Sequence, residues 1–227
     1  MTDYGYIYGT FIKETPNRFL CTVLINNETV ECYIPSSCRL SNFLTLEGQT
    51  VILIPNNNPK ARTRFSVYAV KVGRQFILLN LSKANRIIET ELRTRRFAFL
   101  GQRKHVSTEK NIAGYKSDLF IEDTNTIIEV KSVLSFEKTA YFPTIYSERG
   151  VKQLFKLSSL LDQGYRICYI FVSLNPYVKT IMLNDTIVEY TNSFGECISK
   201  GMKCYGFTIK LQNAVPLLCS QIPTQIE

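Results

Sequence analysis

The sequence predicts a two-domain α+β protein, with an OB-like β-barrel over residues 1–80 followed by an α/β domain with a mixed sheet over residues 81–227. Two observations support this division. Short β-rich runs separated by turn signals fill almost all of the first 80 residues. After Asn80, amphipathic helix patterns alternate with apolar strand patterns, which is typical of α/β structure.

The first domain contains about five or six expected strands, which favours a small closed or nearly closed barrel. The expected strands cover 6–12, 18–25, 29–35, 49–55 and 66–72, with a further run at 75–80. An OB-like barrel is the preferred interpretation, and an SH3-like barrel stays open as the alternative. OB-like barrels commonly hold single-stranded nucleic acid through basic and aromatic side chains.

The second domain begins with a helical pattern over residues 82–100, for which Ser82 is a candidate N-cap. Residues 117–133 then form two β-rich runs on either side of Thr124-Asn125, as in a β-hairpin. A second amphipathic helix is expected over 147–163, and Gly164 would end it.

An apolar strand over residues 166–174 follows this helix. A strand, a helix and a strand in that order predict a right-handed crossover and a parallel strand pair. A further helix around 185–200 and a strand at 203–211 complete the domain. The antiparallel hairpin and the parallel pair together predict a mixed sheet.

The composition predicts an ordered, soluble protein. Hydrophobic residues make up 45% of the 227 residues, yet no run of about 18 apolar residues exists and the N-terminus lacks the pattern of a signal peptide. We therefore expect a cytoplasmic protein with no membrane partner and no small-molecule cofactor. The sequence leaves the oligomeric state open.

Metal-ligating and nucleophilic patterns based on cysteine and histidine are absent. The seven cysteines are scattered without a CxxC pair, and His105 is the single histidine. We interpret the cysteines as reduced, mostly buried thiols rather than zinc ligands. A Ser-His-Asp apparatus is also improbable, which leaves carboxylates and lysine for any hydrolytic chemistry.

The positive charge is clustered. Residues 83–104 hold seven basic and two acidic residues in a chain with a net charge of +8, and a second basic segment, PKARTRF, covers 59–65. Such patches favour a polyanion, most commonly nucleic acid, although each patch alone could be solvated surface. The candidate nucleic-acid-binding residues in these two segments are Lys60, Arg62, Arg64 and Arg86.

A glutamate and a lysine interrupt an otherwise apolar strand. Glu129 and Lys131 project from the same face because side chains alternate along a strand. If Thr124-Asn125 forms a two-residue turn, Asp118 lies opposite Lys131 and Phe120 lies opposite Glu129. Asp118, Glu129 and Lys131 would then share one face of the sheet.

Two carboxylates at this separation can share Mg²⁺, while the lysine ammonium can orient a water or stabilise negative charge that develops on a phosphate. A solvated face or a surface salt bridge is the alternative. The functional interpretation is favoured because Glu129-Val130-Lys131 is the single Asp/Glu-x-Lys sequence in the chain.

The pattern of Asp118, then Glu129-x-Lys131, then a helix and a strand resembles the PD-(D/E)xK nuclease superfamily. The whole chain is similar to the sugar fermentation stimulation protein (SfsA) family, which joins an N-terminal OB-like domain to such a nuclease-like domain. The matching segments are NRF at 17–19, YIPSSCRL at 33–40, ANRIIETEL at 84–92, SDLF at 117–120, IEVKSV at 128–133 and YFPTIYSERGVKQL at 141–154.

The resemblance implies a Mg²⁺ or Mn²⁺ site at Asp118 and Glu129 beside Lys131. It also implies that Glu91 completes the metal shell, unless Glu91 is a surface carboxylate that neutralises neighbouring arginines. Arg149 and Lys152 fit phosphate contacts, although Arg149 could instead pair with a core carboxylate. Two residues that could cap or brace the site are Asn85 and Arg86.

Three positions depart from the family pattern. Thr144 stands where aspartate is common, Gln153 where histidine is common and Tyr33 where histidine is frequent. These departures put a functional role for the three positions in doubt, but they leave the candidate metal ligands intact.

We therefore predict a DNA-binding protein with a divalent-metal-dependent phosphodiester-cleaving site, whose substrate is single- or double-stranded DNA. The alternative is a non-catalytic, DNA-binding regulator of sugar-metabolism genes with a vestigial nuclease fold. A module that binds acidic protein partners through its basic patches is a third interpretation.

Overall fold

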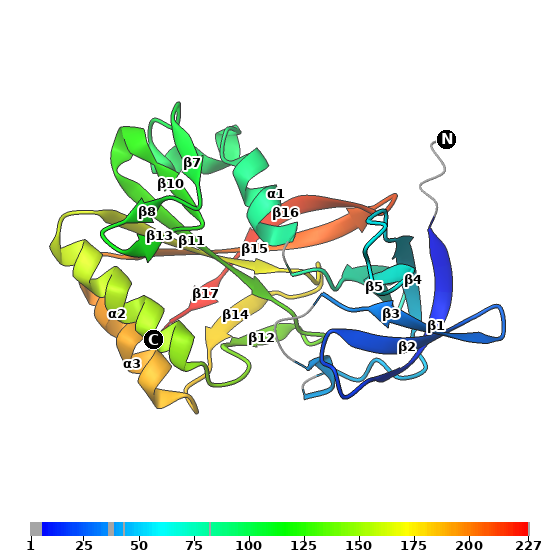
Figure 1. The fold of residues 1–227 in the computed structure, drawn as a ribbon. Helices are drawn as coiled ribbons and strands as arrows, with labels where there is room; N and C mark the ends of the chain where they lie inside the picture. The colour runs from blue at the N-terminus through cyan, green and yellow to red at the C-terminus, as the bar shows by residue number, and fades with distance from the viewer. Residues whose placement is uncertain (1–5, 36–38, 43, 82, 227) are drawn as a thin grey trace.

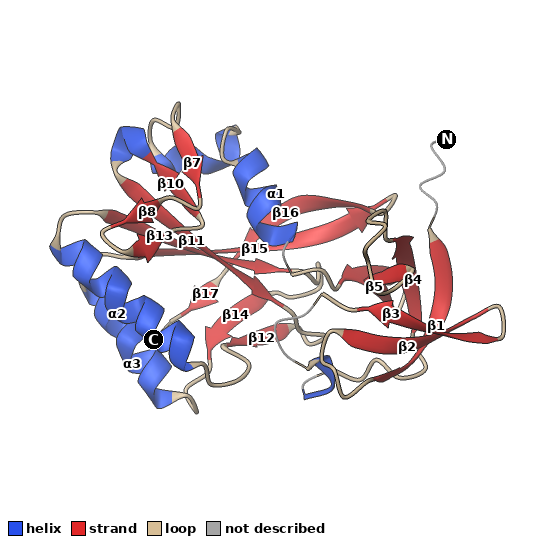
Figure 2. Cartoon of the chain, in the orientation of Figure 1, coloured by secondary structure: helices blue, strands red, loops and turns tan. Residues whose placement is uncertain are grey.

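The computed structural model describes residues 6–35, 39–42, 44–81 and 83–226. Two domains lie side by side, with the N-terminal strands in one and the helices α1 to α3 in the other (Figures 1 and 2). In the described ranges, no helix is both long enough and apolar enough to span a membrane.

The first domain is a barrel. Its elements are β1 (Ile7–Glu14), β2 (Leu20–Ile25), β3 (Glu28–Tyr33), η1 (Leu40–Asn42), β4 (Thr50–Pro55), β5 (Phe65–Val72) and β6 (Gln75–Leu78). The strand order is β3-β2-β1-β4-β5-β6, and a parallel pairing of Tyr33 with Ser66 joins β3 to β5. This contact closes a five-stranded barrel, which confirms the OB-like prediction.

The second domain is built on a mixed sheet in the order β16-β15-β13-β11-β10-β7. Strands β11, β13 and β15 are parallel, whereas β7, β10 and β16 run antiparallel to their neighbours. The sheet strands are β7 (Val106–Thr108), β10 (Leu119–Ile121), β11 (Thr126–Val133), β13 (Arg166–Ser173), β15 (Lys203–Gln212) and β16 (Val215–Ile222). The predicted mixed sheet and its parallel pair, β11 with β13, are confirmed.

Smaller elements surround this sheet. The helices are α1 (Lys83–Glu91), α2 (Glu148–Asp162) and α3 (Val188–Ser199), and the 3-10 helices are η2 (Arg95–Leu100) and η3 (Glu122–Thr124). Two minor sheets contain β8 (Asn111–Ile112) with β9 (Tyr115–Lys116), and β12 (Thr139–Phe142) with β14 (Thr180–Leu183) and β17 (Thr224–Gln225). Helices α2 and α3 pack side by side (Figure 1).

The alternation of side chains along β11 divides the second domain into two layers. Ile127 packs in one apolar cluster with residues of α2 and α3, whereas Ile128 packs in another with Ala84 and Ile88 of α1. The cluster around Ile128 also includes barrel residues such as Ile77. One continuous core therefore joins the barrel to one face of the mixed sheet.

Two expected elements differ in the structure. The helix expected over 82–100 is divided into α1 and η2, because Leu92 to Thr94 leave the helical path between them. The proposed cap Ser82 lies outside the described residues. The helix expected over 147–163 is confirmed as α2, and the side chain of Ser147 caps it by accepting a hydrogen bond from the Gly150 amide.

The hairpin before the candidate site has a different register from the one predicted. Leu119 pairs with Ile128 and Phe120 with Ile127, so Phe120 is not opposite Glu129. The two-residue turn was wrong because η3 lengthens the connection, and Asn125 (φ 50°) adopts the left-handed conformation that ends it. The shift amounts to two residues, which leaves every side chain on the face that was predicted.

A pair of glycine substitutions compares a crowded position in the barrel with an open position in α3. A Cβ atom at Gly9 would lie 2.5 Å from Val23 Cγ1 and 2.9 Å from the Leu24 carbonyl oxygen, so Gly9→Ala should destabilise the protein by about 2 kcal/mol. Gly195, in α3, has nothing within 4 Å of that position, so Gly195→Ala should stabilise by roughly 0.5 kcal/mol. Urea unfolding measures both changes, and equal midpoints for the two variants would contradict the expected packing.

Candidate metal and nucleic-acid site

Asp118 is held at the entrance to β10 by two hydrogen bonds. Its Oδ2 atom accepts from the backbone amide of Val130 in β11 at 2.8 Å. Its Oδ1 atom accepts from Nδ2 of Asn85 in α1, also at 2.8 Å. The carboxylate is therefore fixed by a strand on one side and by a helix on the other, and Asn85 braces it as the resemblance implied.

Glu129 is buried in the middle of β11, with a side chain only 3% exposed. Its Oε1 atom accepts a hydrogen bond from Lys131 Nζ at 2.6 Å, and its Oε2 atom accepts one from the Tyr115 hydroxyl. Gln153, on α2, accepts from Lys131 Nζ at 2.9 Å through its own Oε1 atom. The charge of Glu129 is thus compensated by an ion pair and a hydroxyl donor.

The electrostatics of the site centre on the two carboxylates. Burial raises the pKa of Asp118 to about 6, and the negative charge of Glu129 acts in the same direction. The Val130 amide, Lys131 and Asn85 oppose this rise in part. Burial and the Glu129 charge also raise the pKa of Tyr115 far above its usual range, so this hydroxyl stays protonated and can only donate to Glu129.

Asp118, Glu129 and Lys131 line one cavity of about 640 Å³, which we call the site cavity. Residues from α1, from the segment before α2 and from α2 itself also line it; among them are Asn85, Thr144, Arg149 and Gln153. The side chain of Lys131 is 21% exposed, so it is partly accessible to solvent from the cavity. The three predicted catalytic residues therefore converge on one accessible space.

Glu91 does not join the other two carboxylates. The described ranges contain no group of three or more His, Cys, Asp or Glu side chains that could hold a metal ion. Glu91 lies at the end of α1, where its Oε2 atom is 3.8 Å from Arg96 Nε and 3.4 Å from Thr94 Oγ1. The expectation that it completes the metal shell is corrected to the alternative of a carboxylate beside an arginine, and Asn85 is the α1 residue that reaches Asp118.

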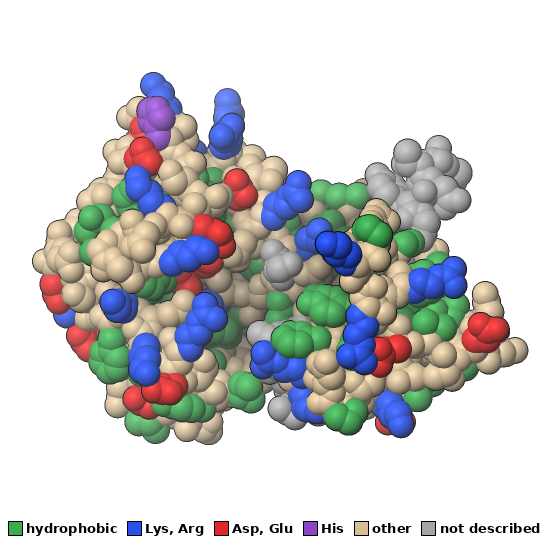
Figure 3. Space-filling model, in the orientation of Figure 1, with side chains coloured by type: hydrophobic (Ala, Val, Ile, Leu, Met, Phe, Trp, Pro, Cys, Tyr) green, Lys and Arg blue, Asp and Glu red, His purple; other side chains and the backbone are tan. Residues whose placement is uncertain are grey.

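A second cavity, of about 770 Å³, adjoins the site cavity and shares Arg149 and Gln153 with it. We call it the basic groove, because its lining residues include Lys116, Arg149, Lys152 and Lys156, with Glu148 as the acidic member. The exposed ring of Phe155 also lines it. Figure 3 shows that Lys and Arg side chains gather over α2 and the β8–β9 hairpin, which form this groove.

The predicted nucleic-acid-binding residues fall into separate places. Arg149 and Lys152 lie in the basic groove, where Lys152 also pairs with Glu148 at 2.6 Å on an exposed surface. The other four candidates line neither the groove nor the site cavity: Lys60, Arg62 and Arg64 lie between β4 and β5, and Arg86 lies on the exposed side of α1. The structure therefore leaves these four as candidates for a different surface.

Sequence reasoning missed three contributors to the site and groove. Tyr115 and Lys116 come from the short β8–β9 hairpin, whose two-residue strands give no periodic signal. Lys156 could have been found, since it follows Arg149 and Lys152 on the polar side of an amphipathic helix.

Comparison with known proteins identifies both parts of the chain. The family profile described as "SfsA N-terminal OB domain" matches residues 14–79. The profile described as "Sugar fermentation stimulation protein RE domain" matches residues 82–214, more than half of the chain. The chain belongs to the sugar fermentation stimulation protein (SfsA) family.

Curated SfsA homologues and a solved SfsA structure agree with this assignment. The chain is 29% identical to the sugar fermentation stimulation protein homolog of Ruminiclostridium cellulolyticum over 198 residues, which cover 86% of each protein. It is 30% identical to the homolog of Clostridium beijerinckii over 196 residues, 84% of this chain and 82% of that one. The structure of Pyrococcus furiosus SfsA in complex with Ca²⁺ matches with a TM-score of 0.81 and 17% identity, covering 97% and 96% of the two chains, which shows a shared fold.

The three departures from the SfsA pattern have different surroundings. Gln153 contacts Lys131 at 2.9 Å and Glu129 at 3.5 Å, so it is part of the site despite the missing imidazole. Thr144 lines the site cavity and is exposed. Tyr33 lies in the barrel, where it lines a separate cavity.

The raised pKa of Asp118 predicts that its charge weakens the fold. Because the folded-state pKa is about 6 against 3.8 for the free side chain, the folded protein binds more protons between these values, and stability falls as pH rises through this window. Asp118→Asn should therefore raise the free energy of unfolding at pH 8 by on the order of 2 kcal/mol.

This gain should disappear towards pH 4, where the parent carboxyl is protonated in the folded state. Urea unfolding across this pH range is the measurement, with Asp185→Asn, at an exposed position, as the control. A stability difference independent of pH, or a loss of stability at pH 8, would contradict the assigned electrostatics.

Proposed function

We propose that this SfsA-family protein binds DNA and cleaves its phosphodiester backbone with the help of Mg²⁺ or Mn²⁺. The convergence of Asp118, Glu129 and Lys131 on the site cavity carries the proposal. The adjoining basic groove supplies the positive surface that a phosphate backbone requires.

The donor set of the site cavity fits a hard divalent cation. Asp118 and Glu129 present carboxylate oxygens to one space. Burial and, after it, the charge of Glu129 raise the pKa of Asp118, and a cation between the two carboxylates would offset both effects. Both Glu129 oxygens already accept hydrogen bonds, but a carboxylate oxygen has two acceptor positions. Mg²⁺ commonly binds through one or two carboxylates and keeps several waters.

A bound Mg²⁺ or Mn²⁺ would supply Lewis acidity toward a phosphate oxygen and would lower the pKa of a bound water. The Pyrococcus furiosus relative was solved in complex with Ca²⁺, a cation that also prefers oxygen ligands. In this chain we assign the cation to Asp118 and Glu129, without Glu91.

Lys131 and its neighbours have distinct roles in the proposed reaction. The ammonium group, held between Glu129 and Gln153, can stabilise the negative charge that develops on the phosphate or orient the attacking water. Gln153 fixes the position of this ammonium group from α2. Tyr115 keeps the Glu129 carboxylate in one orientation by donating to its Oε2 atom.

One observation favours a non-catalytic alternative. Both oxygens of Glu129 already have protein partners, and among the described residues no third acidic or imidazole ligand stands beside the two carboxylates. A DNA-binding regulator of sugar-metabolism genes with a vestigial nuclease fold would tolerate this arrangement. Such a protein would bind DNA equally well with or without Mn²⁺.

Substitution of the site residues separates the two functions. Asp118→Ala and Lys131→Ala are each expected to reduce Mn²⁺-dependent cleavage of labelled DNA by about 100-fold or more, because each removes a charge from the reacting site. Cleavage of single- and double-stranded DNA is measured with Mg²⁺, Mn²⁺ or EDTA. Lys138→Ala, an exposed lysine outside both cavities, serves as the control and should cleave at the parental rate.

Two outcomes would contradict the enzymatic proposal. The first is parental cleavage no faster than that of Asp118→Ala. The second is that calorimetry detects no binding of Mn²⁺ to the parent protein, while Glu129→Ala binds DNA with the same affinity as the parent. The second outcome would support the non-catalytic regulator.

The basic groove predicts a specific salt dependence of DNA binding. Lys116→Ala/Lys156→Ala should weaken binding to duplex DNA and lower the slope of log K against log salt concentration by about 2, since two phosphate contacts are lost. The matched control is Lys138→Ala/Lys179→Ala, which removes the same charge from exposed positions outside the groove. Equal slopes for the two double variants would place the DNA elsewhere.

A further inference from the structure

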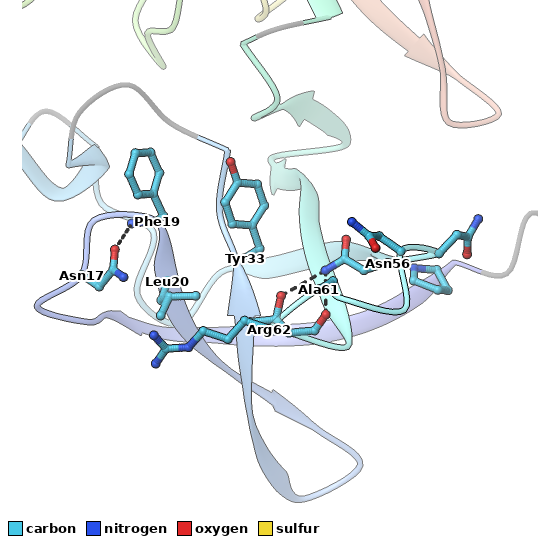
Figure 4. Close-up of a pocket in the computed structure, with 11 residues that line it drawn as sticks. Asn17, Phe19, Leu20, Tyr33, Asn56, Ala61 and Arg62 are labelled. Atoms are coloured by element: carbon cyan, nitrogen blue, oxygen red, sulfur yellow. Dashed lines mark hydrogen bonds between the residues drawn. The ribbon is translucent and has the colours of Figure 1, made fainter.

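The barrel contains a cavity of about 460 Å³ that the proposed cleavage site does not use. We call it the barrel cavity. It lies where the β1–β2 turn and the β4–β5 connection meet strands β2 and β3, and its lining residues are Asn17, Phe19, Leu20, Tyr33, Pro55, Asn56, Asn57, Asn58, Ala61, Arg62 and Thr63 (Figure 4). Three parts of the chain that are far apart in sequence therefore form one pocket on the barrel surface.

Two aromatic rings form one side of this cavity. Phe19 and Tyr33 are 37% and 38% exposed, so part of each ring is accessible to a ligand. Their ring centroids are 6.4 Å apart and the ring planes differ by 19°, so the rings are nearly parallel. Figure 4 shows them side by side and pointing in the same direction, Phe19 from the turn before β2 and Tyr33 from the end of β3.

Amide side chains form the other parts of the lining. Asn17 Oδ1 accepts from the Phe19 amide at 3.1 Å, and Asn58 Oδ1 accepts from the Lys60 amide at 2.9 Å, which fixes the two loops. An amide side chain offers two donor hydrogens as well as its carbonyl oxygen. Asn17 and Asn58 can therefore hold their own turns and also hydrogen-bond a ligand.

The rim of the barrel cavity is positively charged. The guanidinium of Arg18 lies 4.6 Å from the centroid of the Phe19 ring, and Arg62 lines the cavity itself. Lys60 and Arg64 are exposed on either side of Arg62. Glu31 offsets part of this charge by pairing with Arg62 at 3.3 Å, but both side chains of that pair are well exposed. The balance favours an anionic polymer over an uncharged peptide.

We propose that the barrel cavity binds unpaired bases of single-stranded nucleic acid by stacking them on Phe19 and Tyr33. Amide groups then contact the base edges, and the basic rim contacts the phosphates. Bases inside a duplex cannot reach such a platform, because their faces are covered by neighbouring bases. This inference rests on the proposed DNA-binding function and narrows its substrate to nucleic acid that carries an unpaired segment.

The experiment measures, in EDTA, the binding of two labelled probes: a 15-nucleotide oligo-dT and a blunt 15-base-pair duplex. Unlabelled thymidine monophosphate is added as a competitor. Phe19→Leu/Tyr33→Leu keeps apolar bulk at both positions but removes the aromatic faces. We expect its affinity for oligo-dT to fall about tenfold or more, while its affinity for the duplex changes less than twofold. Fluorescence anisotropy measures all three.

Two controls keep this test interpretable. Tyr8→Leu removes an exposed aromatic ring from the same barrel, 60% exposed and outside the cavity, and should bind oligo-dT like the parent. Phe19→Tyr keeps the ring and should also retain oligo-dT binding. Thermal unfolding of each variant checks that the barrel remains folded, and a double variant that unfolds is replaced by Tyr33→Leu alone.

The outcomes separate this inference from the cleavage proposal. Three results would each overturn the single-strand platform. The first is that the double variant loses equal affinity for oligo-dT and for the duplex, and the second is that it loses no affinity for oligo-dT. The third is that thymidine monophosphate displaces oligo-dT at the same concentration as the oligonucleotide does. None of these results depends on metal or on Asp118. Conversely, if the protein does not cleave DNA, the double variant should still lose affinity for oligo-dT selectively.

Discussion

The buried charge of Glu129 is the constraint around which the candidate site is organised. A carboxylate in the middle of an apolar strand is costly unless its neighbours compensate it. Here the compensation comes from three different elements: Lys131 on the same strand, Tyr115 on the β8–β9 hairpin and, through Lys131, Gln153 on α2. The same charge adds to the effect of burial, which raises the pKa of Asp118. Glu129 therefore influences both the hydrogen bonds and the electrostatics of the site.

The second constraint is the core that the two domains share. Ile77 of the barrel and Ile88 of α1 belong to one buried cluster, which continues to Ile128 and Phe207 of the mixed sheet. The Tyr68 hydroxyl also donates to the Ala214 carbonyl oxygen at 2.9 Å across this junction. The barrel is therefore packed firmly against the nuclease-like domain. A nucleic acid that contacts both domains would meet two surfaces in a fixed relation.

Sequence periodicity predicted most of the fold and that the three candidate site residues share one face of the sheet, but it could not predict the contacts that complete the site. The side chains of Asp118, Glu129 and Lys131 share a face of the sheet, as predicted, because side chains alternate along a strand. A register error of two residues leaves this alternation unchanged. Glu91 was misplaced because helical spacing does not say which turn of α1 reaches the sheet. Tyr115 gave no signal, since a hydrogen bond across a short hairpin leaves no periodic trace in the sequence.

The β8–β9 hairpin turns through Ala113 and Gly114, both with positive φ, and Asn111 Oδ1 accepts from the Gly114 amide to close it. Tyr115 and Lys116 follow as consecutive strand residues and so point to opposite faces. Both border the groove, but of the two only the Tyr115 hydroxyl donates to Glu129, whereas the Lys116 side chain is exposed. Deleting or inserting a single residue before them would exchange these faces and bring an ammonium group toward Glu129 in competition with Lys131. The length of this loop therefore determines which of the two side chains reaches Glu129.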